Sequence, residues 1–309
     1  MRIAVTGAFG YSGRYIANRL LQAGHNVITL TNSPKRSNPF GNKLQAFPLR
    51  FDQPDILARS LRNVDVLINT YWVRFDHKLF THEQAVANTR TLFEAAKSAG
   101  VRRIVHVSIT NPDIHSDLPY FRGKAELEAT LISLGASYCI LRPTVLFGKE
   151  DVLINNIAWS LRHLPVFGVF GTGDYKLQPI YVDDLASVAV EKAGNGRNEV
   201  VNAIGPETFT YRGMVEMVRH SLGLRRPIVS VTPKVGYQAC RLLGFFVRDV
   251  IITREEIRGL MEGRLYVDGP PLGGTKLSEW ISEHKNSLGR HYTSEMARRT
   301  DRVAEYRSN

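Results

Sequence analysis

The chain has 309 residues, of which 43% are hydrophobic and 22% charged, so it can form one large or two modest globular domains. Forty Lys and Arg against 29 Asp and Glu give a net charge of +11, which leaves nucleic acid, an anionic membrane surface or an acidic protein open as partners. No basic run is interleaved with aromatic residues as in a nucleic-acid-binding module, so no specific nucleic acid is expected.

Cysteine usage and targeting signals narrow the class further. Cys139 and Cys240 lie far apart, with no CxxC or Cys/His spacing, which argues against a zinc site or a disulfide framework; no metal site is predicted. The sequence starts directly in an apolar strand, without a signal peptide. The most apolar later stretch, 235–247, is interrupted by Arg241 and is too short to span a bilayer. These features predict a soluble, cytoplasmic protein.

The first 32 residues carry the clearest functional pattern. Residues 1–6 (M-R-I-A-V-T) predict a buried parallel strand, 14–23 a helix ended by Gly24, and 27–31 a second strand. The loop between the first strand and the helix is glycine-rich. Glycines let it turn tightly and bring backbone N–H groups close to a pyrophosphate, which then faces the positive end of the helix. The pattern predicts a dinucleotide site, with an ordinary strand-to-helix turn as the alternative. Its predicted contacts are Gly7, Phe9, Gly10, Tyr11, Ser12 and Gly13.

The end of the second strand indicates which dinucleotide binds. NAD sites usually place an acid about 20 residues after the glycine loop, against the ribose 2′-hydroxyl. Here residues 31–36 read T-N-S-P-K-R, and a hydroxyl, an amide and two cations suit a 2′-phosphate better. NADP(H) is therefore favoured over NAD(H), and the alternative is that Lys35 and Arg36 are solvated loop charges. The predicted contacts are Asn32, Ser33, Lys35 and Arg36.

The next elements repeat the strand and helix alternation. Residues 45–51 and 64–69 predict strands, and 55–61 and 83–99 predict helices. Open α/β sheets bind ligands at the carboxyl ends of their strands. The polar side chains at the end of the second of these strands are therefore candidate cofactor contacts: Asn69, Thr70 and Tyr71.

A second motif follows the strand predicted at 103–107. Ser108 and Thr110 stand at its carboxyl end, and Tyr120 and Lys124 form a YxxxK pair that lies one turn apart on the following helix. A cation near the phenol lowers its pKa. Tyr120 can then exchange a proton with a carbonyl or alcohol oxygen while hydride moves to or from a nicotinamide. Surface packing is the alternative for this pair.

The second half of the chain predicts further structure away from the sheet. A sixth strand, 137–141, runs into R-P-T-V-L-F-G, and 180–186 (I-Y-V-D-D-L-A) marks a strand-to-helix junction. Residues 151–176 between them are expected to build the substrate side, and 211–222 predicts a helix packed on the core. At the junction, Asp183 or Asp184 is expected to cap a helix.

The last third predicts one or two helices over 233–264, a turn over 268–275 and a mildly basic helix over 277–302. An apolar group within the first of these segments is expected to form a lid over the substrate, with a partner surface or a membrane-contacting patch as alternatives. It comprises Leu242, Leu243, Phe245 and Phe246.

The segments T-G-A-F-G-Y-S-G-R, Y-F-R-G-K, L-R-P-T-V-L-F-G and I-Y-V-D-D-L-A occur in this order. With them the chain resembles the atypical and extended short-chain dehydrogenase/reductases, in the branch that contains the NADPH-binding accessory subunit of respiratory complex I and bacterial epimerase/dehydratase-like relatives. The resemblance implies an α/β Rossmann fold, a doubly wound parallel sheet of about seven strands, with a small C-terminal substrate lobe. The expected NADP-binding Rossmann domain comprises residues 1–148, completed by 178–204. The substrate-binding lobe comprises 149–177 and 205–290, and residues 291–309 form a basic C-terminal helix or tail.

The same resemblance implies roles for single residues. An acid at Asp52 bonds the adenine amino group in related reductases, although a helix N-cap is its alternative. Lys124 holds the ribose, Thr110 polarises the substrate oxygen, and Ser108 suits the nicotinamide side. Asn88 matches a family asparagine, against the alternative of a solvated or backbone-bonded side chain. The segment expected beneath the nicotinamide contains Pro143, Thr144 and Val145.

The leading prediction is an NADP(H)-dependent oxidoreductase acting on a small, apolar carbonyl or alcohol. The alternatives are a non-catalytic NADPH-binding structural, assembly or sensor protein, and an epimerase or dehydratase with recycled NAD. Residues 108–112 lack the serine-rich strand end and Tyr-Gly pair of sugar epimerases, which disfavours sugar-nucleotide chemistry. A peripheral membrane or protein partner is left open, and no oligomeric state is predicted.

Overall fold

The computed structural model describes residues 1–303, which divide into two compact units. Unit 1 contains Met1–Pro143 and Val182–Ala203, and unit 2 contains Thr144–Tyr181 and Ile204–Asp301. Residues 302–303 belong to unit 1 again, so within the described residues the chain passes between units after residues 143, 181, 203 and 301. The sequence placed the first three of these changes after 148, 177 and 204. Residues 304–309 of the expected basic tail lie outside the described residues.

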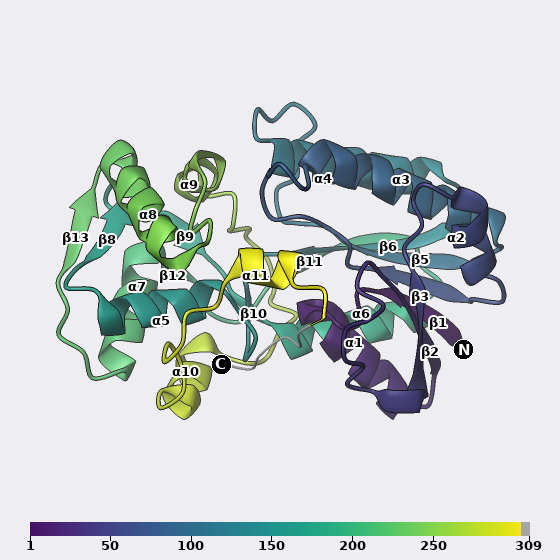
Figure 1. The fold of residues 1–309 in the computed structure, drawn as a ribbon, viewed down its shortest axis with the longest axis horizontal. Helices are drawn as coiled ribbons and strands as arrows, with labels where there is room; N and C mark the ends of the chain where they lie inside the picture. Colours follow the sequence, from purple (N-terminus) through teal and green to yellow (C-terminus); the bar gives the residue numbers. More distant parts are fainter. Residues whose placement is uncertain (304–309) are drawn as a thin grey trace. The chain divides into compact units, whose positions relative to one another are not determined.

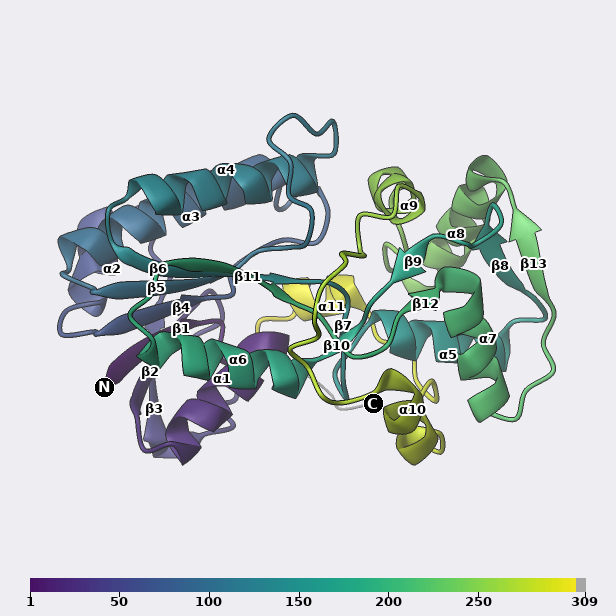
Figure 2. The same ribbon diagram turned by 180° about the vertical axis from the view of Figure 1, so that it is seen from behind.

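Unit 1 is built on one seven-stranded parallel sheet in the order β11-β6-β5-β4-β1-β2-β3. Helices cover both faces, with α1 and α6 on one side and α2, α3 and α4 on the other (Figures 1 and 2). The strand order reverses between β1 and β4, which is where sheets of this kind bind ligands. The expected doubly wound Rossmann sheet is confirmed. Its strands are β1 (Arg2–Thr6), β2 (Asn26–Thr31), β3 (Leu44–Pro48), β4 (Val66–Asn69), β5 (Arg103–Val107), β6 (Ser137–Pro143) and β11 (Glu199–Ala203).

The helices of unit 1 follow the predicted order with shifted ends. The first helix begins at Tyr11 rather than at residue 14, since Gly10 is extended and its carbonyl already accepts from the Arg14 amide at 3.3 Å. The strand predicted over 45–51 ends at Pro48, and a turn closed from Arg50 to Gln53 follows it. The helices are α1 (Tyr11–Gln22), α2 (Pro54–Ser60), α3 (His82–Ser98), α4 (Pro119–Ser133) and α6 (Val182–Gly194), with a 3-10 turn at Gly41–Lys43.

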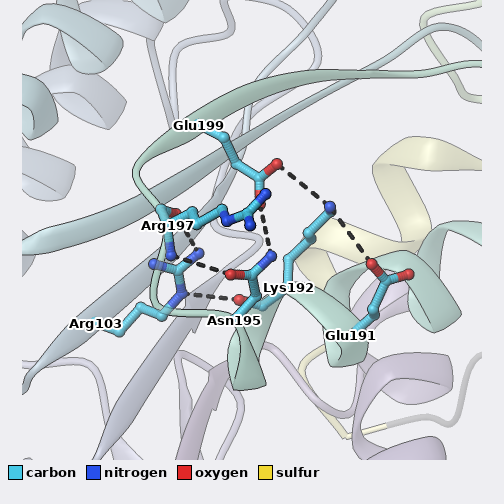
Figure 3. Close-up of polar contacts among 6 residues, drawn as sticks. All are labelled: Arg103, Glu191, Lys192, Asn195, Arg197 and Glu199. Atoms are coloured by element: carbon cyan, nitrogen blue, oxygen red, sulfur yellow. Dashed lines mark hydrogen bonds and ion pairs between the residues drawn. The ribbon is translucent and has the colours of Figure 1, made fainter.

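Arg103 at the start of β5 ties the sheet to the end of α6 (Figure 3). Its guanidinium donates to the backbone oxygens of Lys192 at 2.8 Å and Arg197 at 2.9 Å, and to the Ser137 hydroxyl at 2.6 Å. Only 5% of Arg103 is exposed, and burial lowers the pKa of its guanidinium. Although it belongs to the basic surplus, this residue holds carbonyls of the fold and is not a surface charge open to a polyanion.

Unit 2 packs three helices around its own core, α5 (Leu153–His163), α7 (Tyr211–Ser221) and α10 (Leu277–His284). The predicted packing helix is confirmed, because Met214, Val215 and Val218 of α7 are fully buried. The helix predicted over 277–302 is wrong. It stops at His284, and Gly289 at φ +71° lies so close to Ala158 that a Cβ there would be 2.5 Å from its carbonyl carbon.

The rest of unit 2 consists of short ladders and outer helices. The predicted 233–264 segment forms two helices, α8 (Pro233–Val247) and α9 (Arg254–Met261), and α11 (Glu295–Thr300) follows later. Within residues 1–303, the structure has no helix with both the length and the apolar character needed to cross a membrane. The ladders pair β7 (Leu146–Phe147) with β10 (Ile180–Tyr181), β8 (Phe167–Phe170) with β13 (Ile228–Val231), and β9 (Lys176–Leu177) with β12 (Phe209–Thr210).

Candidate dinucleotide site and Tyr–Lys pair

The glycine loop has the geometry of a phosphate cradle. Gly7 adopts φ +69°, a conformation that favours glycine, and its carbonyl accepts from the Gly10 amide at 2.8 Å. A Cβ on Gly13 would lie 2.3 Å from the Gly7 oxygen, so only glycine lets the helix approach the loop this closely. In α1 no side chain caps the N-terminus and the first turn holds no acid, so the positive helix end is not neutralised from within the helix. This arrangement fits a pyrophosphate.

The end of β2 folds into a tight turn. The Thr31 hydroxyl accepts from the Ser33 amide at 3.0 Å, and the Ser33 carbonyl accepts from the Arg36 amide at 3.0 Å. Arg36 is 7% exposed, so its interpretation as a solvated loop charge is wrong. Asn32 and Lys35 are exposed. The turn therefore leaves the side chain of Arg36 almost fully buried shortly after the end of β2.

A hydrogen-bond network joins the carboxyl ends of β1 and β4. The Thr6 hydroxyl donates to Asn69 Oδ1 at 2.9 Å and accepts from the Thr70 amide at 2.7 Å, while the Thr70 hydroxyl donates to the Thr6 carbonyl at 2.6 Å. Asn69 Nδ2 lies 3.1 Å from Nδ1 of His106, so the amide is well placed to donate to that ring nitrogen. Burial, with Lys124 as a second cause, lowers the pKa of His106 well below its usual value and keeps it neutral. Asn69 therefore braces the sheet edge.

Tyr71 is held from two sides. Its hydroxyl accepts from Asn88 Nδ2 at 2.8 Å, and its ring centroid lies 5.0 Å from that of Phe51. The alternative of a solvated or backbone-bonded Asn88 is therefore wrong. Asp52 is exposed directly after Phe51, and the N-cap of α2 is Gln53, so the alternative of Asp52 as the cap is also wrong.

Tyr120 and Lys124 both contact the indole of Trp72. The ring centroids of Tyr120 and Trp72 are 5.6 Å apart, and Lys124 Nζ lies 4.4 Å from the Trp72 centroid. Lys124 is 2% exposed and donates to the Val107 carbonyl at 2.8 Å. Burial lowers the pKa of Lys124 to about 7, although the charge of Glu128 opposes the shift.

Sequence reasoning missed the contact of Trp72 with Tyr120 and Lys124. The indole fits because position 123 is glycine: a Cβ there would lie 3.0 Å from Trp72 and 2.9 Å from Val86. A glycine between Tyr120 and Lys124 was the available signal, since a helix interior disfavours glycine unless something packs closely against it.

Ser108 and Thr110 are both buried at the end of β5. The Ser108 hydroxyl donates to Glu128 at 2.5 Å, and Arg142 binds the same carboxylate at 3.0 Å through Nε and 2.5 Å through Nη2. The Thr110 amide donates to the Pro143 carbonyl at 3.0 Å. The single proton of Ser108 is therefore committed to Glu128. Sequence reasoning missed the Glu128 and Arg142 pair, although Glu128 follows Lys124 by one turn of the same helix.

The remaining predicted contacts are divided between the units. Pro143 ends β6 in unit 1, whereas Thr144 and Val145 belong to unit 2, where the Thr144 hydroxyl donates to the Gln178 carbonyl. The Asp183 carboxylate accepts two hydrogen bonds from the Arg19 guanidinium, at 2.7 and 2.9 Å, and so joins α6 to α1. Within the described part of the chain, no group of three or more His, Cys, Asp or Glu is placed to hold a metal ion.

The sheet order and glycine loop define an NAD(P)-binding protein of the Rossmann class. Residues 3–204 match the NAD dependent epimerase/dehydratase family, and the chain belongs to that family. The expected resemblance to short-chain dehydrogenase/reductases of the epimerase/dehydratase type is confirmed.

Several proteins of known name are similar to the chain. The NADH dehydrogenase [ubiquinone] 1 alpha subcomplex subunit 9 of Arabidopsis thaliana is 26% identical over 69% of this chain and 56% of its own length. Photosystem II assembly factor Ycf39 of Cyanidium caldarium is 24% identical over 80% of this chain and 79% of its own. The chain spans about three fifths of the length of the mitochondrial relatives it matches.

Two solved structures share the fold over nearly the whole chain. Triphenylmethane reductase of Citrobacter sp. superimposes with a TM-score of 0.78 at 16% identity, covering 93% of this chain and all of the other. The NADPH-dependent quinone oxidoreductase QOR2 of Escherichia coli gives 0.73 at 21% identity, covering 91% and 99%. At these identities the likeness establishes the fold alone.

Proposed function

We propose that this chain binds NADP(H) and transfers hydride to or from a small, apolar carbonyl or alcohol. The observation that carries the proposal is the contact of one indole with both members of the YxxxK pair. Trp72 brings Tyr120 and Lys124 into one cluster just beyond the carboxyl end of β4, on the edge where this fold binds ligands. A pair that only packed the surface of α4 would not need a buried lysine side chain.

The preference for NADP(H) is supported by Arg36. Arg36 places a nearly buried guanidinium, a group well suited to phosphate, at the turn after β2, and residues 31–36 contain no acid to repel a phosphate. The cradle at Gly7 and Gly13 would hold the pyrophosphate, and the proposed contacts of the bound cofactor are otherwise those predicted above.

The proposed roles follow from the geometry of each group. Tyr120 gives its phenol proton to the oxygen of a carbonyl as hydride reaches the carbon, and takes a proton from an alcohol in the reverse direction. Lys124, when protonated, favours the phenolate that results. Thr110 is the proposed donor to the substrate oxygen, because Ser108 already donates to Glu128. The bound nicotinamide supplies or accepts the hydride.

The surroundings of Tyr120 favour a flat, apolar substrate. The ring centroids of Trp72 and His82 lie 5.6 Å from that of Tyr120, and Phe121 lies 5.5 Å away. Aromatic faces of this kind stack on other flat rings. Quinones and aromatic aldehydes or ketones are therefore the first compounds to test.

The test is loss of bound-NADPH absorbance in the presence of a panel of quinones, aldehydes and ketones. Tyr120→Phe should lower turnover by about two to four orders of magnitude while NADPH still binds. Tyr138→Phe is the matched control, since Tyr138 lies in β6 towards its amino end, and it should leave turnover unchanged. Turnover that survives Tyr120→Phe would remove the proposed role of the phenol.

A second candidate, a non-catalytic NADPH-binding assembly or sensor protein, is favoured by a different observation. Ser108 is committed to Glu128 and Arg142, and Lys124 to the Val107 carbonyl, so two of the four proposed catalytic groups already serve the fold. Relatives named as a complex I subunit and a photosystem II assembly factor agree with such a role, and with a protein partner.

The same experiment separates the candidates. NADPH that binds tightly and stays reduced against the whole panel supports the non-catalytic role. Turnover of an alcohol or sugar derivative with retained NAD and no net redox change would instead indicate the recycled cofactor of an epimerase or dehydratase. The cytoplasmic location stays a prediction.

A further inference from the structure

Helix α8 carries large apolar side chains on its outer surface. Val235 is 60% exposed, Leu242 64%, Phe245 80% and Phe246 72%, and we call these four residues the α8 patch. Leu243, which the sequence grouped with them, is half-buried. The rings of Phe245 and Phe246 are 5.8 Å apart, edge to face. A group of this kind on one helix marks an interaction surface.

The inner face of α8 contains two glycines beside the half-buried side chains of Tyr237, Cys240, Leu243 and Val247. Gly236 and Gly244 are its buried positions, and the helix packs beside β8 (Figures 1 and 2). A Cβ on Gly236 would lie 2.5 Å from the ring of Phe170 in β8. An ordinary surface helix buries its large apolar residues and exposes polar ones. In α8, Val235, Leu242, Phe245 and Phe246 are exposed together with the polar residues, so packing within unit 2 does not explain this apolar outer face.

Cations accompany the apolar stripe. At about 100° per residue, Val235, Leu242 and Phe246 fall within about 40° of one another around the helix. Lys234 and Arg241 then lie together about 100° to one side, and both are exposed. This is the pattern of a helix that lies flat in a membrane interface, with apolar side chains inserted and cations beside the headgroups.

The charge of the surrounding segment has one sign. Residues 217–248 contain six Lys and Arg and no Asp or Glu, which is more than half of the net charge of +11. The remaining cations include Arg225 and Arg226 before β13 and Arg248 at the end of α8, and all three are exposed. A surface of this charge is complementary to an anionic one.

The acids that follow α8 do not neutralise the patch. Asp249 accepts hydrogen bonds from Tyr292 and from the amides of Glu295 and Met296 at the start of α11. Glu256 closes the capping box of α9, and Glu255 is exposed in the first turn of that helix. Glu262 is exposed but pairs with Arg258 and Arg264, so over residues 249–256 one exposed carboxylate, that of Glu255, stands against the cations of α8.

We propose that the α8 patch seats unit 2 on an anionic lipid surface, with Phe245 and Phe246 inserted and Lys234 and Arg241 at the headgroups. A second copy of the chain fits less well, because two patches face to face would bring like charges together without acids from residues 217–248 to pair them. This proposal is independent of the hydride-transfer reaction.

The test is flotation of the full chain with phosphatidylcholine vesicles that contain or lack phosphatidylglycerol. Wild type should bind the anionic vesicles, bind neutral ones far less, and be released by salt. Phe245→Ser combined with Phe246→Ser should weaken binding at least about tenfold. Lys234→Gln and Arg241→Gln should each weaken it about fivefold. NADPH binding should be unchanged in all variants.

Matched controls lie in unit 1. Leu79→Ser removes an apolar side chain that is 63% exposed, and Arg62→Gln removes an exposed cation; both should bind anionic vesicles like wild type. Equal binding of all variants, or no binding of wild type to anionic vesicles, would overturn the proposal. So would light scattering that shows a dimer dispersed by the double Phe variant, since the patch would then be a contact between copies.

Discussion

Lys124 makes the stability of unit 1 depend on pH in a direction that can be measured. Burial lowers the pKa of its ammonium from 10.5 in the unfolded chain to about 7 in the fold. Between these values the unfolded chain binds more protons, so the unfolding free energy must rise with pH. From about pH 7 to pH 9, Lys124 alone should add about 2 kcal/mol.

Lys124→Met keeps the length of the side chain and removes the titrating group. In urea unfolding followed by circular dichroism, the variant should lose the rise of about 2 kcal/mol between about pH 7 and pH 9, and should be more stable than wild type near pH 7. Lys97→Met, which removes an exposed lysine of α3, should keep the wild-type slope. An unchanged slope in Lys124→Met would refute the argument that burial deprotonates this amine.

Three further predictions concern the frame and the cofactor. Arg103→Lys keeps the positive charge but removes the guanidinium that donates to Lys192, Arg197 and Ser137. The variant should therefore have an unfolding free energy lower by about 2 to 3 kcal/mol in urea titrations. Arg36→Ala should raise the Kd for NADPH about tenfold to a hundredfold and leave that for NADH unchanged, whereas Lys35→Ala should alter both little, as followed by cofactor fluorescence. Equal losses for the two cofactors would speak against a 2′-phosphate contact. Gly13→Ala forces a methyl group against the Gly7 carbonyl, so NADPH binding should be lost. Thermal unfolding should show a free energy of unfolding lower by about 1 to 3 kcal/mol. Normal NADPH binding by this variant would contradict the cradle geometry.

Local sequence patterns determined the frame of the protein. The alternation of apolar runs and amphipathic helices predicted the successive strands and helices, because strand and helix periods are properties of short segments. The doubly wound arrangement of the sheet was implied by the resemblance to short-chain dehydrogenase/reductases. The glycine loop at residues 7–13 was predictable for the same reason, since its turn depends on neighbours within a few residues. The pairing of Tyr120 with Lys124 on one face followed from helix geometry alone. Their use in catalysis stays a prediction.

Contacts between distant residues were decided only by the tertiary structure. Nothing near Lys124 in the sequence shows that Trp72 lies over its amine, or that Ser108 gives its proton to Glu128. The helix predicted through residue 302 ends at His284, and the chain beyond it approaches Ala158 closely at Gly289, more than a hundred residues away in the sequence.

The outer face of α8 shows the same division between sequence and structure. The sequence predicted helical structure over 233–264 with an apolar group inside it, and a lid over the substrate was the first expectation for that group, with a partner surface or a membrane-contacting patch as alternatives. Whether that group is buried depends on which face of α8 meets β8, and the structure places Gly236 against Phe170 of β8. The sequence by itself determined which elements form and how their residues are spaced, whereas packing among elements far apart in the chain decided which side chains are buried, paired or exposed.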